Sequence, residues 1–563
     1  MSLARPDSRR VMGMVALSLL IALAGLYLVT VLPHLGNDPI VGGDEGWIMS
    51  ASARLAEDGT FGSDLFAGFY GADSHYFFNL PLHHLILAAV FKIAGVGMEQ
   101  ARLVSVLFGL ATLVLTYALG SRIGGRVVGL AAVALLVLLR LNLTPFTGLT
   151  LTDLGATVRY DLIAVPYGLG ATLLVLAAVR TTLLRHVSAF TSTGIQSSSD
   201  TIGVDRSVLF VAAAGFLTGL GALTQFIGAF VGIPLVVFLL TEYSLRLRQR
   251  MQLVAIFALA AILPFLPYGL YAVSNWDDFR GQSRAVEQST DFTSLSFYID
   301  QLRNEPDRYA IGVDLQEAAS GLSGLASRPS ARLVFFLLGP LALVYTARRA
   351  VEGVGAHRML ALMLFGLILQ LALFESTKRF VYWVCVVPYL CIALADFATA
   401  CLQWRPRDPR LALGARIAIA VMVAVIAVEG LVVAARDARE SGDAPSIEAA
   451  GQAIEAALPE GASAIGDNRL WPVLRARPYR SLLLLFYHTN PSISRDQATD
   501  VFGAMDGIGA DYLLLSPLSR EILARLSPEH TAEFDRYLQE RAELTTTVET
   551  PGYGPIEVYR LTR

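Results

Sequence analysis

The sequence is poor in cysteine and carries none of the short motifs typical of soluble nucleotide-binding or hydrolytic enzymes. Its 563 residues include only three cysteines, and all of them lie in or just after one apolar run, at Cys385, Cys391 and Cys401. This placement argues against a disulfide framework and against a thiolate metal site. Neither a nucleotide-binding motif nor a nucleophile elbow is present. The net charge of −3 gives no indication of nucleic acid as a partner.

Charge is also scarce, because charged residues make up only 16% of the chain whereas hydrophobic residues make up 54%. The mean hydropathy of +0.54 is far too high for a soluble enzyme of this size. Since about 20 apolar residues cross a bilayer, the pattern predicts a polytopic α-helical membrane protein with eleven spans. The predicted spans are residues 11–33, 101–120, 127–143, 160–179, 208–223, 226–240, 253–273, 333–346, 359–374, 380–400 and 411–435.

The topology of these spans follows from the arginines. Segment 80–93 is apolar but short and contains His83, His84 and Lys92, so it is predicted to be a juxtamembrane or re-entrant helix. With this segment left out of the count, most arginines beside the spans fall on one side, as the positive-inside rule requires of the cytoplasm. The first apolar run is too long for a signal peptide and lacks a small-residue cleavage site, so we expect it to be retained.

Two domains are predicted on this basis. Residues 1–435 form a transmembrane domain with two extracytoplasmic loops, 34–80 and 274–329, and residues 436–563 form a soluble extracytoplasmic α/β domain. Residues 188–205 are rich in Ser, Thr and Gly and predict a mobile cytoplasmic linker. In the tail, "APSIEAAGQAIEAAL" has helical spacing, and "SAIGD", "DYLLLS" and "PIEVYRLT" predict strands. The tail is interpreted as a cap over a membrane site.

Two adjacent acids follow the first span, in "VGGDEGWIMSASARLAEDG". Asp44 is suited to cap the helix that begins here, and Glu45 is favoured in its first turn by the helix dipole. The other interpretation is functional, because the predicted topology places this helix end at the outer membrane surface.

Several segments resemble, in order, those of GT-C fold glycosyltransferases. They are "DEGWIMSASARLAEDG", "NLPLHHLILAAVFKIAG", "ARLVSVLFGLATLVLTYALGSRIGG", "GATVRYDLIAVPYGLGATL", "GFLTGLGALTQFIGAFVGIPL" and "KRFVYWVCVVPYL". The sequence looks most like the branch that contains protein O-mannosyltransferases and lipid A aminoarabinose transferases. The resemblance covers roughly residues 11 to 400.

This resemblance implies a GT-C type hexosyl- or pentosyltransferase, inverting, in the bacterial cytoplasmic (inner) membrane. It would move a sugar from a polyprenyl-phosphate donor to a hydroxyl on an envelope glycan, lipid or protein, at the extracytoplasmic face. The family's acids match Asp44, the candidate base, together with Glu45 and Asp161. A carboxylate can take the proton of the attacking hydroxyl, and the leaving lipid phosphate needs cationic donors or a metal.

The candidate substrate-binding residues are basic, histidine and tyrosine side chains near these acids. They are Arg159, His75, Tyr76, His83, His84, Arg280, Lys378, Arg379 and Tyr382, with Arg284 as a further candidate for the phosphate. Simpler roles remain open, because Arg159 and Asp161 can pair with nearby charges, and Lys378 and Arg379 can be interfacial anchors. The histidines match no strong ligand motif, so no cofactor is predicted with certainty and a divalent metal stays an option.

The chain departs from the aminoarabinose-transferase pattern at Trp47, Asn79 and Leu80, where that branch has basic and acidic residues. This departure leaves lipid A as acceptor, and that branch's metal site, in doubt. A transporter or flippase of a lipid-linked saccharide is the alternative from another class, although the internal repeats common in transporters are absent from the sequence. A non-catalytic membrane scaffold is the third.

Overall fold

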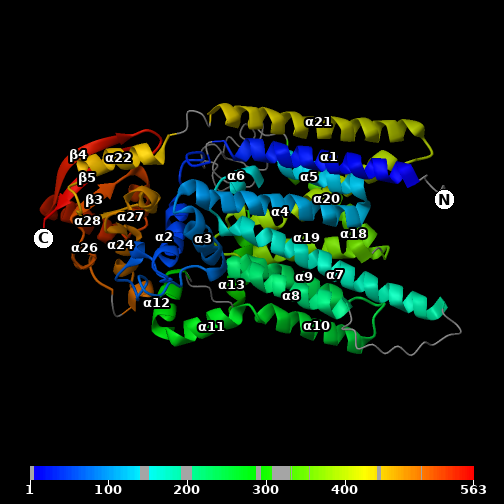
Figure 1. Ribbon diagram of the computed structural model, residues 1–563, viewed down its shortest axis with the longest axis horizontal. Helices are drawn as coiled ribbons and strands as arrows, with labels where there is room; N and C mark the ends of the chain where they lie inside the picture. The colour runs from blue at the N-terminus through cyan, green and yellow to red at the C-terminus, as the bar shows by residue number, and fades with distance from the viewer. Residues whose placement is uncertain are drawn as a thin grey trace.

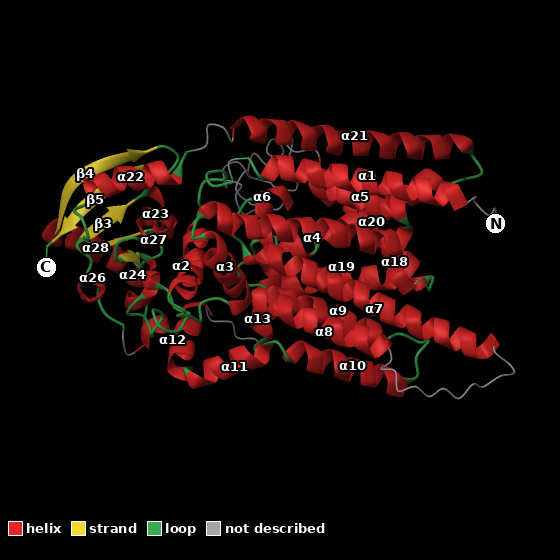
Figure 2. Ribbon diagram, in the orientation of Figure 1, coloured by secondary structure: helices red, strands yellow, loops and turns green. Residues whose placement is uncertain are grey.

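The computed structural model places a bundle of long helices beside a small domain that contains the only strands of its described part (Figures 1 and 2). It describes residues 6–33, 35–139, 151–191, 206–286, 293–306, 308, 330, 333–353, 355–440, 445–495 and 498–562. The N-terminus and the C-terminus lie at opposite ends of the molecule (Figure 1).

Six described helices are long and apolar enough to cross a membrane. They are α1 (Pro6–Val31), α4 (Met98–Gly124), α7 (Tyr160–Thr191), α8 (Arg206–Thr224), α19 (Gly355–Phe374) and α21 (Pro409–Glu440). A seventh candidate is the pair α10 (Leu247–Ile262) and α11 (Phe265–Ser274), which is bent by 49°. The sequence predicted one continuous span here, and that detail is wrong. The bend falls at Pro264, whose ring removes a backbone donor and clashes with the preceding turn.

The remaining predicted spans coincide with shorter helical segments, three of which begin as non-α turns. These are α5 (Arg126–Leu138), η2 (Phe226–Val231) with α9 (Gly232–Leu240), the π-helical η3 (Leu333–Leu338) with α18 (Gly339–Val351), and η4 (Phe380–Cys385) with α20 (Val387–Gln403). The end of the predicted span 127–143 lies outside the described residues. Helix α7 continues to Thr191, so the linker predicted from residue 188 starts later, and residues 192–205 lie outside the described part.

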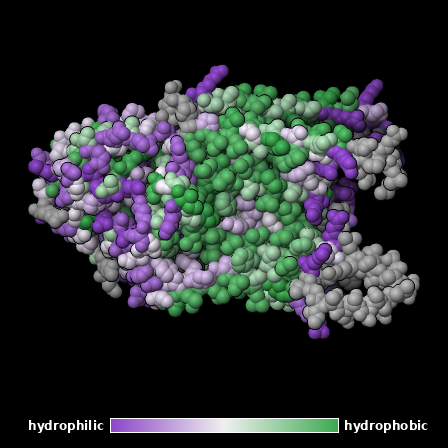
Figure 3. Space-filling view, in the orientation of Figure 1, coloured by the Kyte–Doolittle hydropathy of each residue, from purple (hydrophilic) through white to green (hydrophobic). Residues whose placement is uncertain are grey.

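The visible surface of the bundle is a broad hydrophobic band between two hydrophilic ends (Figure 3). Exposed apolar side chains on α1, α10 and α21, such as Ile21, Leu259 and Val432, contribute to this apolar surface. Water does not favour so large an apolar patch, whereas lipid does. The protein is therefore a multi-pass membrane protein.

The end of the bundle next to the small domain carries the loop helices. The first loop contains α2 (Gly43–Glu57), η1 (Asp64–Phe66) and α3 (Pro81–Ala94), and α6 (Leu151–Gly155) precedes α7. The second loop contains α12 (Trp276–Val286) and α13 (Leu295–Arg303). Gln282 of α12 joins the two loops, because its amide donates to the carbonyls of Tyr70 and His75 and accepts from the N–H of Phe77 at 2.7 to 2.9 Å.

The C-terminal domain is built on a five-stranded mixed sheet in the order β2-β1-β3-β5-β4. The strands are β1 (Ala464–Gly466), β2 (Tyr479–Ser481), β3 (Tyr512–Leu515), β4 (Ala542–Thr550) and β5 (Gly554–Leu561). Strands β1, β2 and β3 are parallel, and β5 is antiparallel to both of its neighbours. The three predicted strands are confirmed, whereas β2 and β4 were not predicted. The helices are α22 (Ile447–Ala457), η6 (Asn468–Leu470), α23 (Trp471–Leu474), α24 (Leu483–Thr489), α25 (Pro491–Ser494), α26 (Val501–Ile508), α27 (Pro517–Leu523) and α28 (Pro528–Arg541).

This domain packs directly on helix α2. A Cβ at Gly46 would lie 1.9 Å from the carbonyl oxygen of Asn468, so only glycine permits this approach. The N–H of Val41 donates to the Tyr553 hydroxyl at 3.2 Å. One apolar cluster, which includes Ile48 of α2, contains buried residues of the first loop and of the C-terminal domain. The domain thus helps to fix the helix that begins with the two acids.

Candidate active site

Glu45 is a buried structural acid in this fold. The residue that caps α2 is Gly42, so the alternative that Asp44 is the N-cap is wrong, and both acids lie in the first turn. The Glu45 carboxylate accepts hydrogen bonds from Arg102 Nε at 2.9 Å and Nη2 at 2.8 Å, and from the N–H groups of Gly42 and Val158, each at 2.8 Å. These four donors leave Glu45 little capacity to take a proton from a substrate.

Asp44 is the accessible acid of the pair. Its side chain is 39% exposed, and its Oδ2 accepts one hydrogen bond, from Arg159 Nη1 at 3.2 Å. The same guanidinium donates through Nε to Asp161 Oδ2 at 2.9 Å. Arg159 therefore bridges the two acids that the sequence suggested, and the helix starts that carry them meet although 117 positions separate them.

Asp161 lies deeper, with a side chain only 1% exposed at the start of α7. Its second oxygen accepts a hydrogen bond from Gln225 Nε2 at 3.2 Å. Asp161 lines a cavity of about 20 Å³, which is room for about one water molecule. The polar side chains that share this cavity belong to Gln225, Tyr382, Cys385 and Tyr389.

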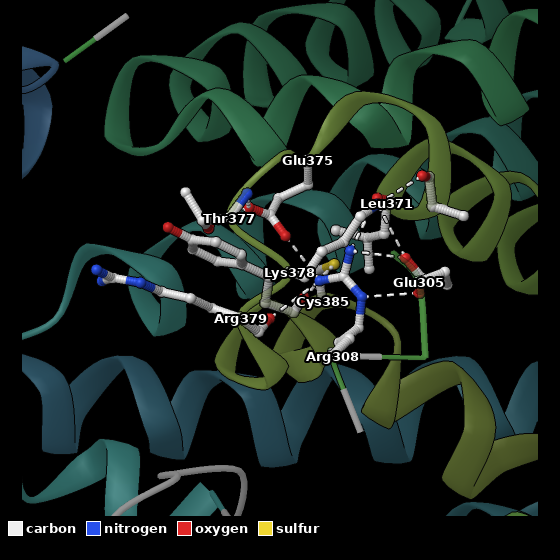
Figure 4. Close-up of polar contacts among 10 residues, drawn as sticks. Glu305, Arg308, Leu371, Glu375, Thr377, Lys378, Arg379 and Cys385 are labelled. Carbon is white, nitrogen blue, oxygen red and sulfur yellow. Dashed lines mark hydrogen bonds and ion pairs between the residues drawn. The ribbon is translucent and has the colours of Figure 1, made fainter. Parts of the chain in front are cut away.

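The segment that follows α19 brings Tyr382 to this cavity, and the exposed Arg379 precedes it by three residues. The Tyr382 hydroxyl is within electrostatic reach of Asp161, Arg159 and Arg379. Lys378 behaves differently, because its ammonium is buried and donates to Glu305 Oε2 at 3.0 Å and to the Ala372 carbonyl at 2.7 Å. Figure 4 shows the Arg379 side chain extending away from Glu305 and Arg308. The simple interpretation of Lys378 as an anchor that reaches the headgroups is therefore wrong.

The two adjacent histidines lie inside the protein, behind the first loop. Burial lowers the pKa of His84 to about 4, and its Nδ1 lies 3.0 Å from Ser52 Oγ and 3.1 Å from the carbonyl oxygen of Ile48. Burial also lowers the pKa of His83 well below its usual value. Both ring nitrogens of His83 are buried without a hydrogen-bond partner among the described atoms.

Other predicted residues lie elsewhere around the first loop. Tyr76 is fully buried, and its hydroxyl accepts a hydrogen bond from Asn79 Nδ2 at 2.9 Å. The hydroxyl also interacts electrostatically with Asp44. His75 Nδ1 lies 2.8 Å from Asp278 Oδ2 on α12, which ties the first loop to the second. Arg280 is exposed on α12, and Arg284 of the same helix is half-buried.

An apolar groove of about 410 Å³ runs along the bundle beside the cavity. It lies between α8, η2, α9 and α10, and η2 starts immediately after Gln225. Several of the side chains that line this groove are small, which leaves space between the helices. Its lining consists of Thr218, Gly219, Ala222, Ala229, Gly232, Ile233, Val236, Val237, Phe257, Ala261, Ile262 and Phe265.

Several residues that shape this site were not predicted from the sequence. Arg102 lies in an apolar span, and an arginine in such a run is itself a signal, because its burial requires a partner. Gln225 is likewise a lone amide between apolar segments. Glu305 and Arg308 are three positions apart, whereas Glu375 joins them from 67 positions beyond Arg308, and no local pattern links it to them.

Comparisons of the sequence itself with known proteins find nothing, because no protein-family model and no curated protein matches the chain. Its structure does have counterparts. One is ArnT from Cupriavidus metallidurans bound to undecaprenyl phosphate, with a TM-score of 0.56 and 17% identity over 96% of this chain and 97% of that one.

A second counterpart is the archaeal oligosaccharyltransferase AglB from Archaeoglobus fulgidus in complex with an inhibitory peptide and a dolichol-phosphate. Its TM-score is 0.56 at 12% identity, over 96% of this chain and 74% of that one. The same oligosaccharyltransferase tethered with an acceptor peptide has a TM-score of 0.57 at 12% identity, over 97% and 74% of the two chains. The predicted GT-C fold is confirmed by these likenesses.

Proposed function

We propose that the protein is a membrane glycosyltransferase that moves a sugar from a polyprenyl-phosphate donor to a hydroxyl acceptor. The observation that carries this proposal is the Asp44–Arg159–Asp161 arrangement, in which one half-exposed carboxylate stands beside a guanidinium held by a second, buried carboxylate. An acid and a fixed cation side by side are what glycosyl transfer from a lipid phosphate requires.

In the proposed reaction, Asp44 accepts the proton of the acceptor hydroxyl as its oxygen attacks the anomeric carbon. The bond between that carbon and the phosphate oxygen breaks, and its electron pair stays on the lipid phosphate. A single displacement of this kind inverts the anomeric configuration. Arg159 and Arg379 neutralise the growing negative charge, and Asp161 with Gln225 holds Arg159 in place.

The apolar groove supports a lipid-linked donor. Segment η2 separates it from the cavity that Asp161 lines, because η2 contributes Ala229 to the groove and Gly228 and Val231 to the cavity. The walls of the groove are almost entirely apolar. A polyprenyl chain gains free energy when it leaves water for such a surface. The structures of ArnT and AglB that resemble this chain contain undecaprenyl phosphate and a dolichol-phosphate, respectively, which is consistent with a donor of this class.

The described residues do not offer a metal the usual set of protein ligands. Among them, no three histidine, cysteine, aspartate or glutamate side chains converge on one point. Glu45 is held by Arg102, and His75 is paired with Asp278. No step of the proposed reaction is therefore assigned to a metal.

The location proposed for this chemistry is the extracytoplasmic face of the bacterial inner membrane, with an envelope glycan, lipid or protein as the acceptor. The arginines beside the predicted spans support this orientation through the positive-inside rule. The Asp44 end of the bundle lies next to the C-terminal domain, opposite the N-terminus (Figure 1).

The test supplies purified protein in vesicles with labelled undecaprenyl-phosphate sugars and follows the release of undecaprenyl phosphate. The proposal predicts release by the wild-type protein and a release that is about 10²- to 10⁴-fold slower by the Asp44→Asn variant. Movement of an intact lipid-linked sugar across the bilayer, without cleavage by the wild-type protein, would identify a flippase instead. Cell-envelope mass spectrometry with and without the protein identifies the acceptor.

A further inference from the structure

A cluster of four charges, three of them buried and one partly buried, lies beside the cavity and takes no part in the reaction described above. Glu305 and Arg308 belong to the second loop, just after α13, whereas Glu375 and Lys378 belong to the turn between α19 and η4 (Figure 4). The Arg308 side chain is fully buried, and those of Glu375, Lys378 and Glu305 are 2%, 4% and 18% exposed. Two acids and two bases make the cluster electrically neutral.

Arg308 is the centre of this cluster. Its guanidinium donates five hydrogen bonds, one from Nε and two each from Nη1 and Nη2, which is the full capacity of an arginine side chain. Two go to Glu305, at 2.8 and 3.2 Å, and one goes to Glu375 at 2.8 Å. The other two go to the carbonyl oxygens of Leu371 at 2.9 Å and Arg379 at 3.0 Å. Arg308 thus holds the backbone on both sides of the turn.

The turn itself has an unusual conformation that this cluster maintains. Lys378 has a φ of +52°, in the left-handed region that residues with a Cβ seldom adopt. This conformation directs two adjacent basic side chains differently. The Lys378 ammonium lies in the cluster, and the Arg379 guanidinium extends away from it (Figure 4).

The cluster also borders the catalytic cavity. Cys385, which lines that cavity, lies beside Arg308 in Figure 4 and feels its charge. Tyr382, three residues after Arg379, lines the same cavity. A shift of the turn would therefore move Arg379 and Tyr382 relative to Asp161.

We propose that Arg308 is a positioning residue that fixes the turn 375–379 so that Arg379 reaches the phosphate of the lipid donor. This inference rests on the proposed function. Arg308 does not touch the donor, and it acts through the Arg379 backbone. The docking of the second loop and the formation of the phosphate site are therefore coupled. The Arg308 guanidinium belongs to the second loop, and the same group fixes the turn that carries Arg379.

The test measures the dissociation constant of undecaprenyl phosphate for the purified full-length protein in detergent. The Arg308→Gln variant is expected to bind this probe about tenfold or more weakly, as the loss of a charged hydrogen bond predicts. The matched control is Arg303→Gln, which removes the same charge from the same loop at a side chain that is 77% exposed. Its dissociation constant is expected to equal that of the wild type.

A double variant separates positioning from a general loss of structure. If Arg308 acts through Arg379, adding Arg308→Gln to Arg379→Gln weakens binding no further, because the contact is already lost. If the loss of affinity in the double variant equals the product of the losses in the two single variants, Arg308 acts independently of Arg379 and the proposal is overturned. Because a lower folded fraction raises the apparent dissociation constant, the folded fraction of each variant is measured from its unfolding curve and the dissociation constant is corrected for it. Where Arg308→Gln does not fold, Glu305→Gln, which leaves Arg308 paired with Glu375, is expected to weaken binding in the same direction.

The outcomes for the two proposals differ. Wild-type binding of undecaprenyl phosphate with unchanged binding by Arg308→Gln overturns the positioning role alone. Binding that depends on Arg308 in a protein that never cleaves its donor overturns the transferase but leaves the positioning role intact. A wild-type protein that does not bind the probe overturns both.

Discussion

Arg102 and Glu45 form a two-point ion pair in the interior of the protein, where their side chains are 0% and 4% exposed. Arg102 also donates to the carbonyl oxygens of Leu35 and Pro39, at 2.9 and 2.8 Å. The pair therefore joins α4, the first loop and the start of α2. Adjacent acids in the sequence thus have different tasks, because Glu45 holds the loop whereas Asp44 faces the site.

Removal of Arg102 is expected to destabilise the fold. Arg102→Met leaves the Glu45 carboxylate buried without its cation, which costs about 3–5 kcal/mol. Thermal unfolding of the purified protein in detergent measures the loss. The control is Arg54→Gln, which removes an arginine paired with Asp64 near the surface and is expected to cost less than about 1 kcal/mol. Equal losses for the two variants would contradict the structural role of Arg102.

Substitution of the two adjacent acids is expected to separate catalysis from stability. Asp44→Asn removes the proposed base and is expected to lower the rate of sugar transfer about 10²- to 10⁴-fold at an unchanged unfolding temperature. Glu45→Gln weakens a charge-assisted network and is expected to lower the unfolding temperature. Transfer rates and melting curves of both variants, measured side by side, check this. An active Asp44→Asn protein would remove Asp44 from the mechanism.

Filling the apolar groove is expected to weaken binding of the donor chain. Ala229→Phe places a ring in the groove and should raise the KM for a long-chain polyprenyl-phosphate sugar, but not for a short-chain analogue. The control is Leu259→Phe, at a side chain on α10 that is 70% exposed and does not line the groove. If the KM rises equally for the long-chain and the short-chain donor, the polyprenyl chain of the donor does not lie in this groove.

Stability is expected to fall in acid because of His84. The pKa of His84 is about 4 in the folded protein because of burial, against 6.5 for the free side chain, so the unfolded state binds more protons between these values. His84 therefore lowers stability as the pH falls from 6.5 to 4, by up to roughly 3 kcal/mol. The unfolding temperature across this pH range should depend less on pH in the His84→Asn variant than in the wild type. A pH dependence that is the same in His84→Asn as in the wild type would contradict this origin of the acid sensitivity.

Much of the architecture is predictable from the sequence because lipid imposes a simple rule. Over the residues that the structure describes, each predicted span coincides with helical segments, since backbone groups in a hydrocarbon core must bond within their own helix. The 49° break at Pro264 was not predicted, nor were the 3₁₀ segments η2 and η4 that precede α9 and α20. They depend on how neighbouring helices pack, and hydropathy does not record packing.

The candidate site was predictable in part, for a similar reason. Asp44, Arg159 and Asp161 stand at helix starts, where charged residues beside an apolar run are conspicuous. The different tasks of Asp44 and Glu45 were not predictable, because they depend on Arg102, 57 positions after Glu45. Short strands such as β2, with three residues, carry too little periodicity to be recognised, and β4 is mostly exposed and polar.

The contact between Gly46 and the Asn468 carbonyl restricts which substitutions related proteins can accept. A side chain at position 46 requires the backbone at 468 to retreat, and the retreat of that backbone leaves a gap beside the helix that presents Asp44. Position 46 therefore cannot gain a side chain at low cost, whereas the side chain at 468 takes no part in the contact. We expect related chains whose C-terminal domain packs in this way to keep glycine at position 46, and a chimera that joins this domain to a bundle without that glycine to fail at this contact.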